Sequence, residues 1–185
     1  MKRALAMILT VFLLTGCSKS GSIDGALVLR EQLLKSNGCS FDALITADYG
    51  DKLYTFSMHC QTNNQGDLTF SVTEPQTIRG ITGVISSEGG KLTFDDQALA
   101  FEMIADGQIT PVSAPWLFIR TLRSGYIAYS GEDEAYTRVG FDDSYRDDAL
   151  HLDIWFAENN LPVHAEILWQ GRRVVSIDVI NFLCV

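Results

Sequence analysis

The sequence predicts a mainly antiparallel β domain with two helices, and three observations lead to this fold class. Apolar and polar side chains alternate along most of the chain, which is the period of strands with one buried face. Short turns rich in glycine, asparagine or aspartate separate the alternating runs, as in hairpins. Only two segments have a helical period. We expect about eleven strands, at residues 39–49, 54–60, 68–73, 78–86, 91–95, 98–103, 126–130, 136–141, 149–157, 162–169 and 173–182.

The first helix is expected at residues 24–35. Ser22 or Asp24 can cap its start, and Asn37 and Gly38 end it. Its apolar stripe comprises Ile23, Ala26, Leu27, Leu33 and Leu34.

The second helix is expected at residues 113–124, between the strands of the two halves. Ser113 caps it, Pro115 lies in its first turn and Gly125 ends it. One side of this helix is apolar, so it packs in a core or covers an apolar cavity. The side chains concerned are Trp116, Leu117, Phe118, Thr121 and Leu122.

Two hairpins can be aligned from their side-chain patterns. A turn at Tyr49-Gly50 sets Cys39 opposite Cys60, whereas a turn at Gly50-Asp51 sets Phe41 opposite Cys60 and leaves the cysteines diagonal. The sequence predicts a Cys39–Cys60 disulfide in either case, with free buried thiols as the alternative and Cys184 unpaired. Near the C-terminus, a turn at Asn159-Asn160 pairs residues whose numbers sum to 319.

The composition limits the classes of function. The chain has 185 residues, of which 46% are hydrophobic and 20% charged, so it builds one domain with a core rather than a disordered chain or a multi-span membrane protein. Its net charge of −9 argues against nucleic acid as a partner. No internal repeat is found.

The N-terminus predicts export and lipidation. Residues 1–3 are basic at Lys2 and Arg3, residues 4–14 are mostly apolar and uncharged, and Leu14-Thr15-Gly16-Cys17 resembles the bacterial lipobox. The resemblance implies a signal peptide at 1–16, a diacylglycerol on Cys17 and a flexible tether at 17–23, with an ordinary secretory signal as the alternative. The mature chain would carry 12 basic against 23 acidic residues, a net charge near −11. Its acyl chains, not its charge, would therefore hold it on a bacterial membrane outside the cytoplasm.

Candidate chemistry is sparse. The 319 register sets Asp153 opposite Glu166 on the outer side of the sheet, with His151 and His164 nearby. A cation would relieve that repulsion, but a solvated surface does so at little cost, and we expect no metal. The sequence has no motif for nucleophilic catalysis, a zinc hydrolase or a phosphate loop, so we expect neither an enzyme nor a cofactor.

The C-terminal half resembles the LolA/LolB-like family. The resemblance rests on Leu152-Asp153-Ile154-Trp155-Phe156, on Asn160-Leu161-Pro162-Val163, and on Gly171 with a closing strand that ends Ile180-Asn181-Phe182. It implies, over residues 24–183, a half-open antiparallel barrel of about eleven strands with helices against an apolar concave face. The family includes periplasmic lipoprotein carriers and the related domain of envelope-stress regulators.

These observations predict a non-catalytic binder or carrier of a lipid or acylated ligand. An open barrel has a broad apolar face that its own side chains do not fill, and a movable helix can cover it. The cavity is expected to be bounded by Phe118, Leu122, Leu152, Ile154, Ile167 and Trp169. The alternative is a protein-interaction or sensor module in cell-envelope homeostasis, and a glycan hydrolase is a third option.

Overall fold

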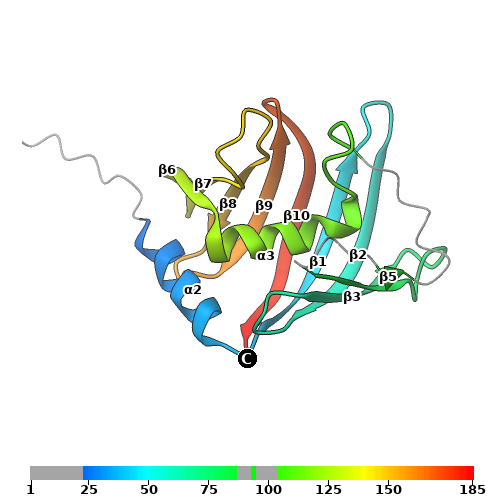
Figure 1. Cartoon of the computed structure of the whole chain (residues 1–185), viewed down its shortest axis with the longest axis horizontal. Coiled ribbons are helices and arrows are strands. Elements are labelled where there is room, and N and C mark those ends of the chain that lie inside the picture. Colours follow the sequence, from blue (N-terminus) through cyan, green and yellow to red (C-terminus); the bar gives the residue numbers. More distant parts are fainter. Residues whose placement is uncertain (1–22, 87–92, 95–103) are drawn as a thin grey trace, which may run out of the picture.

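The computed structural model of the chain describes residues 23–86, 93–94 and 104–185. They form one antiparallel sheet in the order β5-β4-β3-β2-β1-β10-β9-β8-β7-β6, so the edge strands β5 and β6 are far apart and the sheet is open (Figure 1). The strands are β1 (Cys39–Asp48), β2 (Leu53–Thr62), β3 (Leu68–Glu74), β4 (Thr82–Ile85), β5 (Thr93–Phe94), β6 (Tyr126–Asp133), β7 (Tyr136–Asp142), β8 (His151–Phe156), β9 (Pro162–Trp169) and β10 (Arg172–Cys184).

The antiparallel sheet with two helices is confirmed, but the described residues form ten strands rather than about eleven. The expected strand at 98–103 lies outside the described residues, as do the signal peptide at 1–16, Cys17 and the tether up to residue 22. In the part of the chain that the structure describes, no helix is both long and apolar enough to cross a membrane.

The first helix, α2 (Asp24–Lys35), has the predicted bounds but a different N-cap residue and a different buried face. Ile23 is the N-cap residue, so Asp24 lies in the first turn, where its carboxylate complements the positive end of the helix dipole. The helix buries Ala26, Leu29 and Leu33, whereas Leu27 and Leu34 are 42% and 58% exposed. The contact stripe is therefore narrower than the apolar pattern suggested.

The second helix, α3 (Ala114–Ser124), was predicted at 113–124; it follows a short 3₁₀ turn, η2 (Pro111–Ser113), and crosses the sheet (Figure 1). Ser113 is its N-cap residue, but its hydroxyl donates to the carbonyl of Thr110 instead of capping the helix. Leu117, Phe118, Thr121 and Leu122 are buried, as expected. We call the side of the sheet that α3 covers the inner face, and the opposite side the outer face.

The first hairpin adopts the register with Phe41 opposite Cys60 and its turn at Gly50-Asp51. The expected Cys39–Cys60 disulfide is not formed; both thiols are free and buried. Diagonal neighbours on antiparallel strands lie about 7–8 Å apart, beyond the roughly 4.4–6.8 Å between Cα atoms that a disulfide needs. Thr62 lies beside Cys39 instead, with its hydroxyl 3.2 Å from the Cys39 sulfur.

The C-terminal hairpins show how bulges correct a register. The 319 pairing of β8 with β9 is confirmed from His151 to Trp155, and a bulge then pairs Phe156 with Pro162. The turn before β10 has two residues, Gln170 and Gly171, and not the three that were expected. A bulge between Arg173 and Val175 supplies the extra residue, so the inward side chains of β10 are still those predicted: Val175, Ile177 and Val179.

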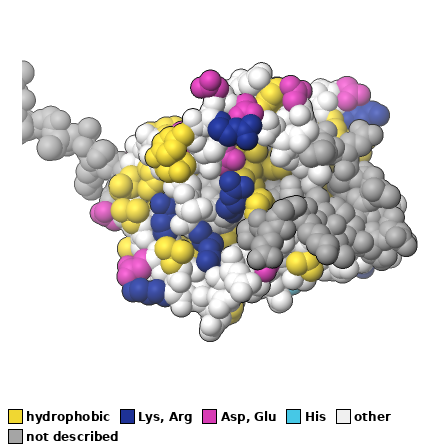
Figure 2. All heavy atoms as spheres, viewed as in Figure 1, with side chains coloured by type: hydrophobic (Ala, Val, Ile, Leu, Met, Phe, Trp, Pro, Cys, Tyr) yellow, Lys and Arg dark blue, Asp and Glu magenta, His cyan; other side chains and the backbone are white. Residues whose placement is uncertain are grey.

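The core lies between the inner face and the two helices. Alternate residues of β1 are buried, from Cys39 to Ala47, and Phe41 meets Phe118 of α3 in an edge-to-face contact with ring centroids 5.9 Å apart. The helix-bearing side is also where Lys and Arg side chains gather over α2 and α3, although the chain as a whole is acidic (Figure 2).

Candidate functional site

A pocket of about 510 Å³ opens beside the start of α3, at the turn end of the β1–β2 hairpin. Its walls come from three separate segments: the hairpin, the loop at 75–78 and η2. The lining residues are Tyr49, Asp51, Lys52, Tyr54, Thr55, Phe56, Pro75, Thr77, Ile78 and Pro111. We call this space the hairpin pocket. Its volume is within the range of small-molecule sites, roughly 300–1,000 Å³.

The floor of the hairpin pocket belongs to the core. Phe56 is buried and forms part of the central apolar cluster, and Ile78 packs against that cluster. Tyr49 and Tyr54 form the rim, with their rings in an edge contact at 5.2 Å between centroids. Two exposed charged residues, Asp51 and Lys52, also line the pocket. An apolar chain with a polar end suits such a site, because its chain reaches the floor while its end group stays at the rim.

The residues predicted to bound the ligand cavity are brought together, but as a packed core. Phe118, Leu122, Leu152, Ile154 and Ile167 are all buried in one cluster. Trp169 packs on the edge of that cluster and lines a separate pocket of about 320 Å³ with the 147–151 segment. Access to the inner face at these residues would require α3 to move.

The two helices are tied together at the end of α3 remote from the hairpin pocket. Arg30 of α2 donates to the carbonyls of Leu122 and Gly125 at 2.7 and 2.8 Å. Arg123 of α3 donates to the carbonyls of Leu33 and Asn64 at 3.2 and 2.8 Å. These four bonds hold the C-terminal end of α3, whereas its N-terminal end continues from η2 and Pro111 at the pocket.

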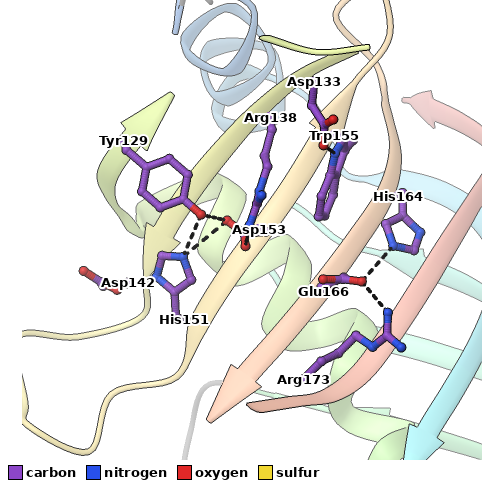
Figure 3. Close-up of polar contacts among 10 residues, drawn as sticks. All are labelled: Tyr129, Asp133, Arg138, Asp142, His151, Asp153, Trp155, His164, Glu166 and Arg173. Atoms are coloured by element: carbon purple, nitrogen blue, oxygen red, sulfur yellow. Dashed lines mark hydrogen bonds and ion pairs between the residues drawn. The ribbon is translucent and has the colours of Figure 1, made fainter. Parts of the chain in front are cut away.

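The outer face of β6–β9 carries a second candidate, a network of charged and aromatic side chains (Figure 3). At its centre Asp153 is 1% exposed and accepts hydrogen bonds from the Tyr129 hydroxyl and the Arg138 guanidinium. His151 lies between two carboxylates, with Nδ1 2.8 Å from Asp142 and Nε2 3.3 Å from Asp153. We call this set the outer network. Its remaining members come from β6, β8, β9 and β10 and are Asp133, Trp155, His164, Glu166 and Arg173.

The electrostatics of Asp153 explain why a carboxylate is stable there. Burial by itself would raise the pKa of Asp153, but hydrogen bonds from His151, Arg138 and Tyr129 outweigh it and hold that pKa well below its usual range. The same contacts act on the partners. Burial and the bond to Asp153 raise the pKa of Tyr129 to about 12, and the bond to Asp153 raises the pKa of His151.

The like charges that the sequence placed opposite each other, Asp153 and Glu166, are confirmed as cross-strand partners. Each has its own cation: Arg138 pairs with Asp153, and Arg173 donates to Glu166 at 2.6 Å. The repulsion therefore needs no bound ion. Among the described residues, no group of three or more His, Cys, Asp or Glu side chains is placed to hold a metal.

Trp155 and His164 connect the two halves of the outer network. The Trp155 indole N–H donates to Asp133 at 2.7 Å, and its ring lies under the Arg138 guanidinium, 5.0 Å from the ring centroid. His164 contacts the Trp155 ring edge and bonds Asp178 at 2.6 Å. The network thus connects five strands through directional contacts, and its role is to stabilise the pairing of these strands.

Sequence reasoning missed the hairpin pocket, Tyr129 and Arg138. Tyr49 and Tyr54 flank the hairpin turn, and two aromatic residues beside one turn are a pattern that the sequence shows. Ile78 and Pro111 reach the pocket only through tertiary packing. Tyr129 lies over Gly140, whose lack of a side chain admits the ring. A glycine inside an otherwise regular strand is a sequence signal for such a close approach.

No family model and no curated protein matches the sequence. Solved structures with a similar backbone arrangement include a LolA superfamily protein from Nitrosomonas europaea, 8% identical, with 86% of this chain and 93% of that chain covered and a TM-score of 0.39. A domain described as an outer membrane lipoprotein-sorting protein, from Vibrio parahaemolyticus, is 5% identical over 86% of this chain and 90% of that one, with a TM-score of 0.39. A chain of the Pseudomonas aeruginosa MucA/MucB complex is 10% identical over 86% of this chain and 56% of that one, with a TM-score of 0.40.

Proposed function

We propose that this protein is a membrane-anchored extracytoplasmic lipoprotein whose folded domain binds or carries a lipid or acylated ligand without transforming it. The observation that carries the proposal is the hairpin pocket, whose floor, Phe56, is part of the apolar core under the inner face. An acyl chain inserted there would replace water by apolar contacts, at about 0.8 kcal/mol per buried methylene. The resemblance of the sequence to the LolA/LolB-like family points to the same class of ligand.

A longer ligand would need more of the inner face than the pocket offers. The N-terminal end of α3 adjoins the pocket through Pro111, while Arg30 and Arg123 hold the other end. We therefore propose that α3 pivots away from the sheet at its N-terminal end, and that the acyl chain then contacts the predicted cavity residues. Phe118 would leave Phe41 in this movement.

Binding is tested with a fluorescent fatty acid and the chain purified in mild detergent. Thr77 lines the pocket from an exposed loop, so Thr77→Trp should fill the pocket and weaken binding at least tenfold. Thr69→Trp, at an exposed position of β3 outside the pocket, is the matched control and should bind as the wild type does. Absence of saturable binding at micromolar probe, or equal loss in both variants, would contradict the proposal.

The movement of α3 has its own readout. Trp116 is partly buried on α3 beneath Arg120, whose guanidinium lies 5.3 Å from the ring centroid. Ligand binding should shift the tryptophan emission, and Trp116→Phe should remove most of that shift while binding remains. An unchanged shift in Trp116→Phe would contradict the movement of α3, because the change in emission would then come from Trp155 or Trp169.

The anchor is tested at Cys17. Cys17→Ala should leave the chain either uncleaved or released in soluble form, because acyl chains on Cys17 are the proposed attachment. Mass spectrometry of the wild-type N-terminal peptide should show a diacylated Cys17 as the first residue. A different first residue, or an unmodified Cys17, would overturn the anchor.

A second candidate, a protein-interaction module, is favoured by the β6 edge of the sheet. Among the described residues, this eight-residue strand pairs with β7 alone. Tyr126 and Tyr129 on β6 and Tyr136 on β7 are each at least 40% exposed. An exposed edge can receive a strand from a partner, and exposed tyrosines are typical of protein interfaces. Native mass spectrometry after mild extraction separates the two: co-purifying lipid supports the carrier, and a stoichiometric protein supports the interaction module.

A further inference from the structure

We propose that Cys39 and Cys184 form a disulfide that joins the first strand of the domain to the last. The sequence pattern had assigned Cys39 to Cys60 and left Cys184 unpaired, but the sheet places β1 beside β10, the last strand. The C-terminus lies beside the start of β1 (Figure 1). The modification site therefore consists of one buried and one exposed thiol on neighbouring strands, β1 and β10.

The register supports this pairing. Cys39 and Cys184 are direct cross-strand partners in the antiparallel pair β1–β10. The Val185 N–H donates to the Gly38 carbonyl at 3.0 Å, immediately next to the pair, so the strands are closed at this point. Direct partners have Cα atoms about 4.5–5.5 Å apart, inside the range of roughly 4.4–6.8 Å for a disulfide.

The side chains of the two cysteines also share a face. Cys39 lies two residues before Phe41 on β1, and Cys184 lies two residues after Phe182 on β10. Because side chains alternate along a strand, each cysteine is on the same side of the sheet as its phenylalanine. Phe41 and Phe182 stack in the core with ring centroids 5.6 Å apart. Cys39 and Cys184 are thus the next inward pair along the same two strands. Cys60 lies on the other side of β1, diagonal to Cys39, and its own direct partner is Phe41.

The exposures of the two thiols define the order of the chemistry. Cys184 is exposed, so its thiolate attacks an external disulfide, such as oxidised glutathione or the disulfide of a thiol oxidoreductase. A mixed disulfide forms at Cys184 and one thiolate leaves. Cys39 then loses its proton to solvent and attacks the Cys184 sulfur, which releases the second thiol. Two electrons pass to the oxidant, and the protein gains one disulfide for two thiols.

The surroundings make this exchange slow but selective. Burial raises the pKa of Cys39 to about 11, and partial burial raises the pKa of Cys184 as well. Both are therefore mostly protonated at neutral pH, which protects them from indiscriminate modification. Once Cys184 carries a mixed disulfide, Cys39 is the thiol beside it. A compartment outside the cytoplasm, as the N-terminus predicts, permits the resulting bond.

Trypsin provides a direct test, because it separates the four cysteines into different peptides. Cys17 falls in residues 17–19 of the proposed mature chain, Cys39 in 36–52, Cys60 in 53–79 and Cys184 in 174–185. The folded chain, in mild detergent at about pH 8.5, is treated with oxidised glutathione, digested without reductant and analysed by mass spectrometry. We expect peptide 36–52 linked to 174–185. A link between 36–52 and 53–79, a lasting glutathione adduct on 174–185, or no oxidation at all would overturn the proposal.

Three variants control the result. Cys60→Ala should form the same link, because Cys60 takes no part. Cys39→Ser should accumulate the glutathione adduct at Cys184, which would show that Cys184 reacts first. Cys184→Ser, a change at an exposed position, should fold normally and form no link. Oxidation should raise the melting temperature of the wild type and leave that of Cys184→Ser unchanged; equal shifts in both would contradict the cross-link.

Discussion

The two faces of β8 show how differently one strand can be held on its two sides. Toward α3, Leu152 and Ile154 are fully buried among apolar neighbours. On the outer face Asp153 is equally inaccessible, yet it is surrounded by hydrogen-bond donors from Tyr129, Arg138 and His151. The contacts on the inner face depend on area and shape, whereas those on the outer face depend on direction and charge.

This difference suggests which parts of the molecule can move. Apolar contacts are non-directional, so a ligand's methylenes can replace those of α3 at similar free energy. The outer network cannot be exchanged in this way, because each bond requires a particular partner on a neighbouring strand. It also opposes strand slippage, since a shift by one residue would turn Asp153 into the core. We therefore expect ligand-linked motion in α3 and a rigid sheet behind it.

The largest expected effect concerns the inner face. Leu122→Ala, at a fully buried position of α3, should lower the free energy of unfolding by about 2–5 kcal/mol, because it leaves a cavity. Leu34→Ala on α2, where the side chain is 58% exposed, is the matched control and should change it by less than about 0.5 kcal/mol. Urea denaturation measures both, and similar losses in the two variants would contradict the assignment of the core.

On the outer face, the corresponding pair of changes compares a fully buried carboxylate with one that is 20% exposed. Asp153→Asn keeps the shape of the side chain but removes the counter-charge of Arg138. It should lower the free energy of unfolding by about 3 kcal/mol. Glu166→Gln, whose partner Arg173 has a 60% exposed side chain, should cost less than about 1 kcal/mol. Equal costs would mean that the outer network is not organised around Asp153.

The close contact between the Tyr129 ring and Gly140 gives a smaller effect on the free energy of unfolding, which a double mutant can isolate. A Cβ at Gly140 would lie 2.3 Å from the Tyr129 ring, so Gly140→Ala should displace that ring and cost about 1–3 kcal/mol. In a Tyr129→Ala background the same change should cost little, because the clash is gone. A double-mutant cycle measures the coupling. Additive effects would show that Tyr129 does not rest on Gly140.

The smallest expected effect is a dependence of stability on pH. The pKa of His151 is raised, chiefly by its bond to Asp153 and also by Asp142, so the protonated ring stabilises the fold. That contribution is complete below the ordinary histidine pKa of about 6.5 and is lost as the pH rises through the higher folded value. The stability advantage of the wild type over His151→Gln should therefore shrink by up to about 1 kcal/mol between mildly acidic and alkaline pH. Thermal melts across that range test it, and a growing advantage would reverse the assignment.

Local pattern was sufficient for much of the fold. The alternation along β1 and β8, and the helical stripe with Gly125 after α3, predicted these elements and their buried sides. The 319 pairing was also predictable, because a register set by the turn near Asn159-Asn160 brings the apolar faces of both strands to the same side. Asp153 opposite Glu166 follows from that register, whereas the arginines that neutralise them come from strands whose pairing the pattern did not specify.

The sequence by itself determined the fold class, the two helices and the inward residues of β10, whereas the signal peptide at 1–16 stays a prediction. All of these depend on residues near one another along the chain. Only the tertiary structure decided which of two hairpin registers holds, and with it that Cys39 faces Thr62 rather than Cys60. It likewise brought Cys184 beside Cys39, and Pro111 and Ile78 beside Tyr54. Contacts between residues so far apart in the chain depend on how the whole sheet closes on its core, which no local period specifies.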